Sequence, residues 1–394
     1  MGLAKVTIIG DMMCEPLLLK AARVNDGYDF SSVYSHVKDL FQQSDFVIGN
    51  LETPLAGEKS GYVHDLFSFN APVEFAVAAK EAGVSLVSTA NNHCMDRGFD
   101  GMLETVKQLD KVKLAHVGTY LSPDQEERTF FRDVKGQTIA VVAYTYGTNY
   151  SMHHRLLDST QETHINLLRP YKESVFLQQQ KKKRLTKKIF NKALTCLKRE
   201  HQIAIKKALG MTYNSPRKDD SVNLETAAPY YEKVREEIKE AAKKADIVLF
   251  LPHMGGQFNQ DPGLFSLSVM KMAKEAGAHA IISSHPHVVQ KAELSDGVPL
   301  FFSIGNFCMS PNSVYLLHED LPEYGIAVHL YIDGKTIVRI TFSILKCVEE
   351  AKSMLTVWPV EKLAHPCEEE IKKIYHTVTG KALLEPIIRS EYEV

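Results

Sequence analysis

The chain has 394 residues, of which 44% are apolar and 24% charged, and its formal net charge is −2. This length can bury a large core as one domain or two, and the near-balanced charge excludes overall charge as the basis for binding nucleic acid. No apolar stretch approaches the roughly 20 residues of a membrane helix, and the N-terminal run Val6-Thr7-Ile8-Ile9 is too short for a signal peptide.

Short β-branched runs alternate with helical patterns over the first 120 residues. We predict strands at residues 6–9, 46–48, 86–88 and 114–117. Amphipathic helices are predicted between them at residues 30–41, 73–81 and 101–109. This β-α-β alternation is typical of a sheet with a parallel portion.

A hairpin follows, with strands at 130–134 and 138–144 joined by Lys135-Gly136. Later helices are predicted at 230–244 and 264–276, with strands at 247–251, 280–283, 301–304, 326–332 and 336–344. We predict one domain over residues 1–345 and a C-terminal appendage over 346–394 with a helix at 368–375.

The alternation breaks between residues 150 and 226. Residues 181–207 hold eleven basic side chains against the single acid Glu200. Apolar residues in this segment recur at helical spacing, so we predict a basic helical insertion. It is either a solvated helix or an arm that attracts a polyanion through its charge.

Polar side chains follow the predicted strands at six places. They are Gly10-Asp11, Asn50 with Glu52, Asn91-Asn92-His93 with Asp96, His253, His285-Pro286-His287, and Gly305-Asn306. Because ligands bind beyond the carboxyl ends of parallel strands, these residues are candidates for one crevice. Carboxylates and imidazoles suit zinc, manganese or iron.

The two imidazoles of the His285-Pro286-His287 run would share a face if the backbone stays extended through Pro286. Each cluster has an ordinary structural alternative, such as a turn after Gly10 for Asp11. Together and in this order, they indicate a metal centre.

In this order the motifs resemble those of the capsule-biosynthesis CapA (poly-γ-glutamate synthesis) family, which belongs to the calcineurin-like metallophosphatase superfamily. The matching runs are Gly10-Asp11, Gly49-Asn50-Leu51-Glu52, Asn91 through Gly98, His253-Met254-Gly255, His285 through Gln290, and Ser303-Ile304-Gly305-Asn306-Phe307. They cover roughly residues 5–310, apart from the basic insertion. The resemblance implies an α/β sandwich of two central mixed β-sheets flanked by helices, here with a helical insertion.

The resemblance also implies roles for single residues. Asp11 and His287 would hold one metal ion, Glu52 would bridge, and Asn92, His253 and His285 would hold a second. His93, beside Asp96, would donate a proton to the leaving group. Four further residues would contact the substrate or support the ligands: Asn50, Asn91, Gln257 and Asn306. The implied cofactors are two divalent transition metal ions (Mn, Fe or Zn), or one that is tightly bound.

Two positions depart from the family pattern. Met13 stands where many metallophosphatases have a histidine ligand, so the first metal would be completed by Asn50 or water. The run His253-Met254-Gly255-Gly256-Gln257 replaces His-Trp-Gly-x-Glu and lacks both the tryptophan and the carboxylate. These departures affect the expected substrate more than the expected fold.

The favoured function is a metal-dependent hydrolase that cleaves a phosphoester with metal-activated water, acting on an anionic small molecule or polymer. One alternative is cleavage of a γ-glutamyl amide in poly-γ-glutamate metabolism, and another is a non-catalytic polymer-binding component of capsule synthesis. Retention of His93 favours catalysis, because a scaffold does not need a proton donor. Six cysteines without framework spacing and no export signal predict reduced thiols in the cytoplasm.

Overall fold

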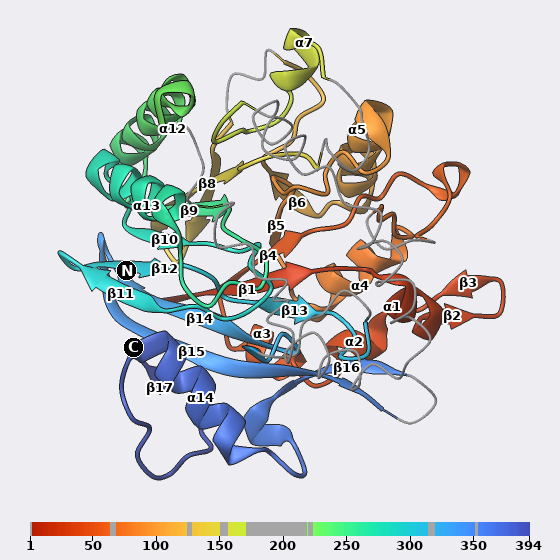
Figure 1. Ribbon diagram of the computed structural model, residues 1–394, viewed down its shortest axis with the longest axis vertical. Helices are drawn as coiled ribbons and strands as arrows, with labels where there is room; N and C mark the ends of the chain where they lie inside the picture. The colour runs from red at the N-terminus through yellow and green to blue at the C-terminus, as the bar shows by residue number, and fades with distance from the viewer. Residues whose placement is uncertain are drawn as a thin grey trace, which may run out of the picture.

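Two β-sheets lie face to face at the centre of the computed structural model, which describes residues 2–63, 68–123, 128–149, 157–170, 219, 224–313, 320–350 and 354–394 (Figure 1). In these residues the first sheet has nine strands in the order β16-β15-β14-β1-β4-β5-β6, with β13 beside β1 and β17 beside β15. Its strands are β1 (Ala4–Met12), β4 (Phe46–Leu51), β5 (Leu86–Ser88), β6 (Ala115–Val117), β13 (Asn306–Cys308), β14 (Tyr324–Asp333), β15 (Thr336–Glu349), β16 (Leu355–Pro359) and β17 (Tyr392–Glu393).

The second sheet has six strands within the described ranges, in the order β11-β12-β10-β9-β8-β7. They are β7 (Phe130–Val134), β8 (Gln137–Thr145), β9 (Ile247–His253), β10 (Ala280–Ile282), β11 (Ala292–Ser295) and β12 (Val298–Phe301). A separate two-stranded hairpin consists of β2 (Arg23–Val24) and β3 (Gly27–Tyr28).

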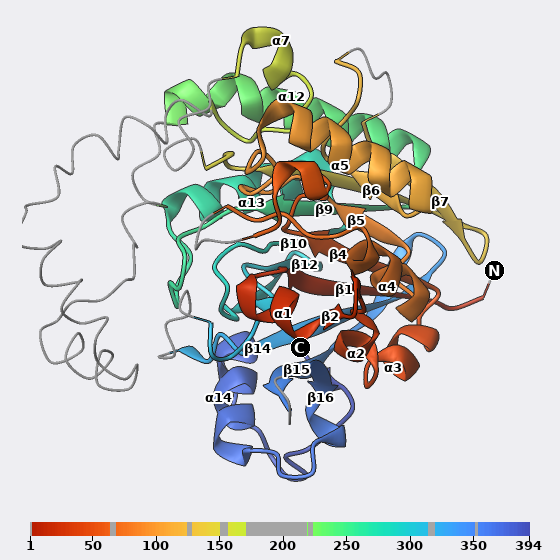
Figure 2. The same cartoon turned by 90° about the vertical axis from the view of Figure 1, so that its right-hand side faces the viewer.

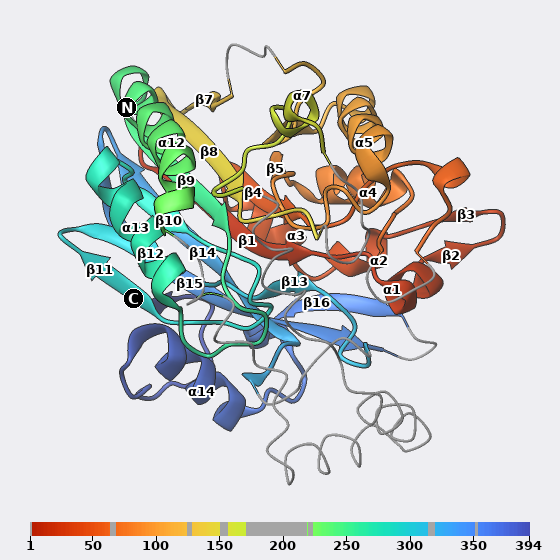
Figure 3. The same ribbon diagram turned by 45° about the horizontal axis from the view of Figure 1, so that its top comes forward.

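Helices cover the outer faces of both sheets. On the first sheet side lie α1 (Pro16–Ala21), α2 (Ser31–Tyr34), α3 (Lys38–Gln42), α4 (Glu74–Ala82) and α5 (Gly98–Val112), with the 3₁₀ turn η1 (Glu58–Ser60). The second sheet is covered by α12 (Leu224–Lys244) and α13 (Leu264–Ala276), which lie side by side in Figures 1 and 3. The remaining helices are α7 (Ser159–Glu162), η4 (Val360–Lys362) and α14 (Glu368–Thr379), and Figure 2 shows α14 at the opposite end of the molecule from α12.

Alternation of side chains along the strands builds the layers. On β1, Val6 and Ile8 face the core between the two sheets, whereas Ile9 faces the layer of α1–α4. On β9, Leu249 faces the inter-sheet core and Phe250 faces α12 and α13. The two-sheet α/β sandwich flanked by helices, predicted from the sequence, is confirmed.

Both sheets are mixed, and their parallel portions place the ends of five strands together. In the first sheet, β1, β4, β5 and β6 run parallel, while β14, β15 and β16 are antiparallel additions. In the second sheet, β8, β9, β10 and β12 run parallel. The predicted polar clusters therefore lie at or just after the ends of β1, β4 and β5 in one sheet and of β9 and β10 in the other.

Some predicted elements differ from the structure. The single helix expected over residues 30–41 is two short helices, α2 and α3, because a turn bond from the Val37 N–H to the Tyr34 carbonyl (3.1 Å) ends α2. The strand expected at 301–304 ends at Phe301, and β13 begins only after Gly305, whose φ is 71°. Strands β2, β3, β11, β13, β16 and β17 were not predicted.

Three further expectations concern the basic insertion, the domain boundary at residue 345 and membrane-spanning helices. The basic insertion, including residues 181–207, lies outside the described residues. β15 continues to Glu349, past residue 345, and the division into a domain and an appendage stays a prediction. Among the helices of the described residues, none has the length and apolar character needed to cross a bilayer.

Candidate metal centre

Asp11 reaches the centre through a close approach of two backbone segments. A Cβ atom on Gly10 would lie 2.0 Å from the carbonyl oxygen of Gly305, so only glycine fits at residue 10. The same carbonyl accepts a hydrogen bond from the Asp11 N–H (3.1 Å). Gly10 and Gly305 thus bring the ends of β1 and β13 together, with the Asp11 and Asn306 side chains beside each other in register.

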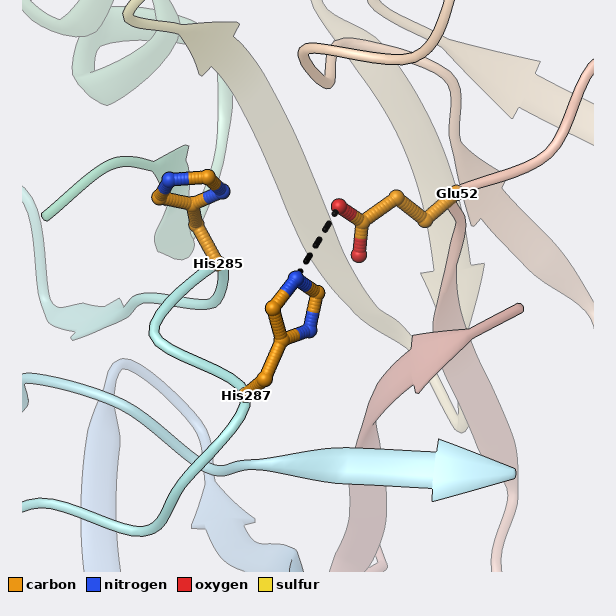
Figure 4. A group of neighbouring side chains, drawn as sticks. All are labelled: Glu52, His285 and His287. Atoms are coloured by element: carbon orange, nitrogen blue, oxygen red, sulfur yellow. Dashed lines mark ion pairs between the residues drawn. The ribbon is translucent and has the colours of Figure 1, made fainter. Parts of the chain in front are cut away.

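Glu52, directly after β4, lies at the middle of the cluster. Its side chain is fully buried, and neither carboxylate oxygen accepts a hydrogen bond from any described residue. Its Oε1 lies 3.3 Å from His253 Nε2, 3.8 Å from His287 Nε2 and 3.9 Å from His93 Nε2. In Figure 4, His287 points at the Glu52 carboxylate from the loop after β10, with His285 beside it. A buried carboxylate surrounded by imidazoles and lacking hydrogen bonds is the environment that a cation would satisfy.

Ligand-type atoms form two overlapping groups in the described residues. Atoms of Glu52, His285 and His287 lie within 4.8 Å of one another, and so do atoms of Asp11, Glu52 and His253. Glu52 belongs to both groups, as a bridging ligand would. The donors are oxygen and imidazole nitrogen, which fit Mn, Fe or Zn. The assignment of each residue to one ion stays a prediction.

His253, the last residue of β9, joins the two sheets at the cluster. Its Nε2 lies 2.7 Å from Asn92 Oδ1, and its Nδ1 lies 2.9 Å from Ser284 Oγ. The ring therefore directs Nε2 toward both Asn92 and Glu52. If Asn92 and His253 are ligands of one metal, as predicted, Asn92 Oδ1 and His253 Nε2 must lie close together, and they do.

Burial and neighbouring charges set the protonation of the cluster. Burial lowers the pKa of His253 to about 3, which leaves the imidazole neutral and able to bind a metal. Burial opposes ionisation of Asp11, but the His287 imidazole outweighs it, and the pKa of Asp11 is lowered to about 2.

The pKa values of Glu52 and His287 are both raised, so these two groups hold protons that offset the negative charge of the cluster. Burial, reinforced by the Asp11 carboxylate, raises the pKa of Glu52 well above its usual value. Burial opposes protonation of His287, yet Glu52 and Asp11 raise its pKa to about 9. The cluster thus favours added positive charge, which protons or metal ions can provide.

His93 and Asp96 form a hydrogen-bonded pair in the segment between β5 and α5. His93 Nδ1 donates to Asp96 Oδ2 (2.7 Å), and the same oxygen accepts the Phe69 N–H (2.7 Å). The Phe69 ring lies edge-on to the imidazole, with centroids 4.6 Å apart. Asp96 therefore fixes Nδ1 as the protonated nitrogen and leaves Nε2 facing Glu52.

Of the four amides expected to contact the substrate or support the ligands, three make hydrogen bonds at or beside the cluster, and their roles stay predictions. Asn50 Nδ2 donates to Asp11 Oδ1 (2.7 Å), so its amide nitrogen, and not its oxygen, faces the first predicted metal position. Asn91 Nδ2 donates to Leu51 O (2.8 Å), and Asn306 Oδ1 lies 3.0 Å from His287 Nδ1. Gln257 is half-buried after β9, and within the described part of the chain no hydrogen bond or ion pair connects its side chain to the cluster.

The backbone at the paired histidines is not extended. β10 ends at Ile282, and His285 and His287 have φ angles of 106° and 59°. Positive φ is unusual for residues other than glycine. Both imidazoles still lie at the cluster, because the turn through Pro286 replaces the strand geometry on which the expectation depended.

Sequence reasoning missed the residues that follow β8. Asn149 Oδ1 accepts a hydrogen bond from Asn92 Nδ2 (3.0 Å), and its own Nδ2 lies 3.3 Å from His93 Nδ1. The Tyr146 ring centroid lies 4.6 Å from that of His285. The signal was available, since Tyr146-Gly147-Thr148-Asn149 follows a predicted strand just as the other six clusters do.

The model of the family "Bacterial capsule synthesis protein PGA_cap" matches residues 5–311. This chain belongs to that family. The match covers the second sheet, β4, β5, β6, β13 and most of β1 in the first sheet, and every residue of the cluster, and it confirms the resemblance drawn from the motifs.

Curated relatives of this PGA_cap chain carry capsule-related names. The chain is 25% identical over 303 residues to "PGA biosynthesis protein CapA" of Bacillus subtilis (strain 168), covering 76% of this chain and 62% of that protein. It is 23% identical over 336 residues to "Capsule biosynthesis protein CapA" of Bacillus anthracis, covering 84% and 65%. The chain thus spans less than two thirds of the length of these relatives. A solved structure with a similar chain is a hypothetical protein from Thermus thermophilus, at 16% identity and a TM-score of 0.42, covering 86% of this chain and 98% of that chain.

Proposed function

We propose that this protein is a metal-dependent hydrolase that cleaves a phosphoester of an anionic substrate. The observation that carries the proposal is the fully buried Glu52 carboxylate, which lacks hydrogen bonds and has imidazoles on three sides. Asp11, Glu52, Asn92, His253, His285 and His287 would hold one or two divalent transition metal ions. Such ions supply activation of water and neutralise charge that develops during displacement.

The protein's own residues would position the leaving group and protonate it. His93 Nδ1 donates to Asp96, so a proton given toward the cluster would be the one on Nε2 of the doubly protonated ring, which is left neutral with its proton on Nδ1. Asn149 holds the Asn92 amide and packs against the His93 ring, which fixes the ligand and the proton donor relative to each other. Burial of the His93 and Asp96 side chains keeps bulk water away from this proton.

Two alternatives differ in the bond or in catalysis itself. The names of the relatives favour a role in poly-γ-glutamate metabolism, in which the same centre would act on a γ-glutamyl amide. A polymer-binding component of capsule synthesis would retain the metal but has no need of the His93–Asp96 pair. A cytoplasmic location stays a prediction.

The test begins with elemental analysis of protein purified without chelators, before and after reconstitution with Mn, Fe or Zn. The metal-loaded protein is then assayed with a phosphomonoester, a phosphodiester and a γ-linked glutamate oligomer. Phosphate release that depends on metal supports the proposal. Glutamate release without phosphoester cleavage would establish the amide alternative, and metal without turnover of any of the three would favour a binding component.

A further inference from the structure

Tyr146 lies directly against two of the predicted metal ligands. Its ring centroid is 4.6 Å from that of His285 and 6.5 Å from that of His253, whose plane is within 14° of parallel. The Tyr146 N–H donates to the His253 carbonyl (3.0 Å), because β8 and β9 run side by side up to this point. The ring is half-buried. Tyr146 therefore forms a fixed wall of the centre on the side of the second sheet.

Arg169, which is buried, lies over the Tyr146 ring. Arg169 Nε donates to the Tyr146 carbonyl (3.0 Å), and its guanidinium carbon lies 5.1 Å from the centre of the Tyr146 ring. The segment that carries it is fixed to the end of β8 by the hydrogen bond from the Leu168 N–H to the Thr145 carbonyl (2.8 Å). Because guanidinium is always protonated, it places a permanent positive charge beside the phenol.

The backbone directly after Tyr146 has open space on one side, at Gly147. Gly147 is buried, yet a Cβ atom placed on it would meet none of the described residues within 4 Å, apart from its own chain neighbours. The Tyr146 hydroxyl makes no hydrogen bond with the described part of the chain, which leaves its O–H available as a donor. A tyrosine hydroxyl keeps its proton at neutral pH, because its ordinary pKa is about 10.

We propose that the Tyr146 hydroxyl and the Arg169 guanidinium form an anion subsite that binds a negatively charged oxygen of the substrate beside the metal centre. The hydroxyl donates the hydrogen bond and the guanidinium provides the positive field. The subsite extends the proposed function, because it assumes that the substrate reaches the metal cluster. A phosphoryl oxygen and a γ-glutamyl carboxylate share the required chemistry, and binding measurements with each distinguish them.

The experiment compares Tyr146→Phe with wild type, both loaded with metal, in calorimetric titrations with inorganic phosphate and with a γ-glutamyl dipeptide. Loss of one hydrogen bond to an anion should weaken binding of the preferred ligand about tenfold. Metal content per chain should not change, because the phenol is not a predicted ligand. The matched control is Tyr28→Phe, which removes a half-buried phenol that packs on Phe30 and Tyr62 in the β2–β3 hairpin region.

The outcomes separate this subsite from the proposed hydrolysis. Weaker binding by Tyr146→Phe, with Tyr28→Phe unchanged, supports the subsite even if no phosphoester is cleaved. If a phosphoester is cleaved, KM should rise more than kcat falls. Equal affinity of wild type and Tyr146→Phe for both ligands, or no binding of either by metal-loaded wild type, overturns the subsite. Arg169→Lys should retain more affinity than Arg169→Met, and circular dichroism checks that both variants are folded.

Discussion

Replacing His93 with asparagine tests whether this side chain transfers a proton and does not bind metal. General acid catalysis contributes about 10²–10⁴-fold, which corresponds to roughly 2.7–5.4 kcal/mol of activation free energy. Turnover of a substrate with an alkoxide leaving group should fall by that factor. Metal content should be unchanged, because His93 belongs to neither group of ligand-type atoms and approaches Glu52 only to 3.9 Å. Asp96 would keep the Phe69 N–H (2.7 Å) and lose its bond to His93, so we expect a destabilisation of about 1–3 kcal/mol.

His164 provides a matched control for the structural part of this effect. It is also buried, lies edge-on to a phenylalanine (Phe99, 4.9 Å between centroids) and makes one Nδ1 contact, to the Tyr120 carbonyl (2.9 Å). His164→Asn should lower the free energy of unfolding without lowering turnover per folded molecule. Rates are compared by steady-state kinetics and stabilities by urea unfolding. Wild-type turnover of an alkoxide ester by His93→Asn at equal metal content would refute the proton-transfer role.

Three further predictions concern metal, backbone strain and pH. His253→Ala should lose at least one metal ion per chain in elemental analysis, because its Nε2 lies nearest to Glu52, and full retention would contradict the ligand assignment. In chelator-treated protein, His285→Gly should be about 1 kcal/mol more stable to urea than His285→Ala, since φ is 106° and glycine relieves that strain; the reverse order would show that the backbone relaxes. Burial lowers the pKa of His329 to about 3, so the unfolded chain binds the proton more readily and stability falls as pH drops below about 6.5. In chelator-treated protein, His329→Gln should remove up to about 1.4 kcal/mol per pH unit of that fall, and an unchanged slope between pH 6.5 and 5 would contradict it.

The strand-helix alternation predicted a sheet with a parallel portion because its central strands carry strong local signals, whereas the two-sheet sandwich was implied by the resemblance of the motifs. Runs such as Ile247–His253 and the helix Leu264–Ala276 have clear periodicity, and strand-helix alternation restricts the topology. The edge strands were missed because they depend on tertiary contacts. Leu355–Pro359 becomes β16 by pairing with residues 345–349 of β15, and nothing local in its sequence specifies that partner.

The candidate site was predictable where a motif follows a strand, and less so where geometry decides. Asp11, Glu52 and His253 lie together because parallel strand ends meet at one edge. The direction of the Asn50 amide could not be read from spacing, since it depends on the position of Asp11 across the sheet. Tyr146 was missed because aromatic residues after a strand are commonly core, and only the contact of its ring with the His285 ring distinguishes it.

The cost of the cluster to stability argues for a chemical role. Several residues with positive φ have simple explanations, such as Lys113 at the C-terminus of α5 and Lys135 in the β7–β8 turn. His285 and His287 have no such explanation, and a conformation of this kind costs of order 1–3 kcal/mol. Glu52 adds a buried carboxylate without a hydrogen bond beside them. Glycine or glutamine at these positions would relieve strain or charge, and the proposed cation site accounts for the imidazole and carboxylate groups that stand there instead. A scaffold could bind that cation without His93 held by Asp96, and this pair is therefore the feature that favours hydrolysis over polymer binding.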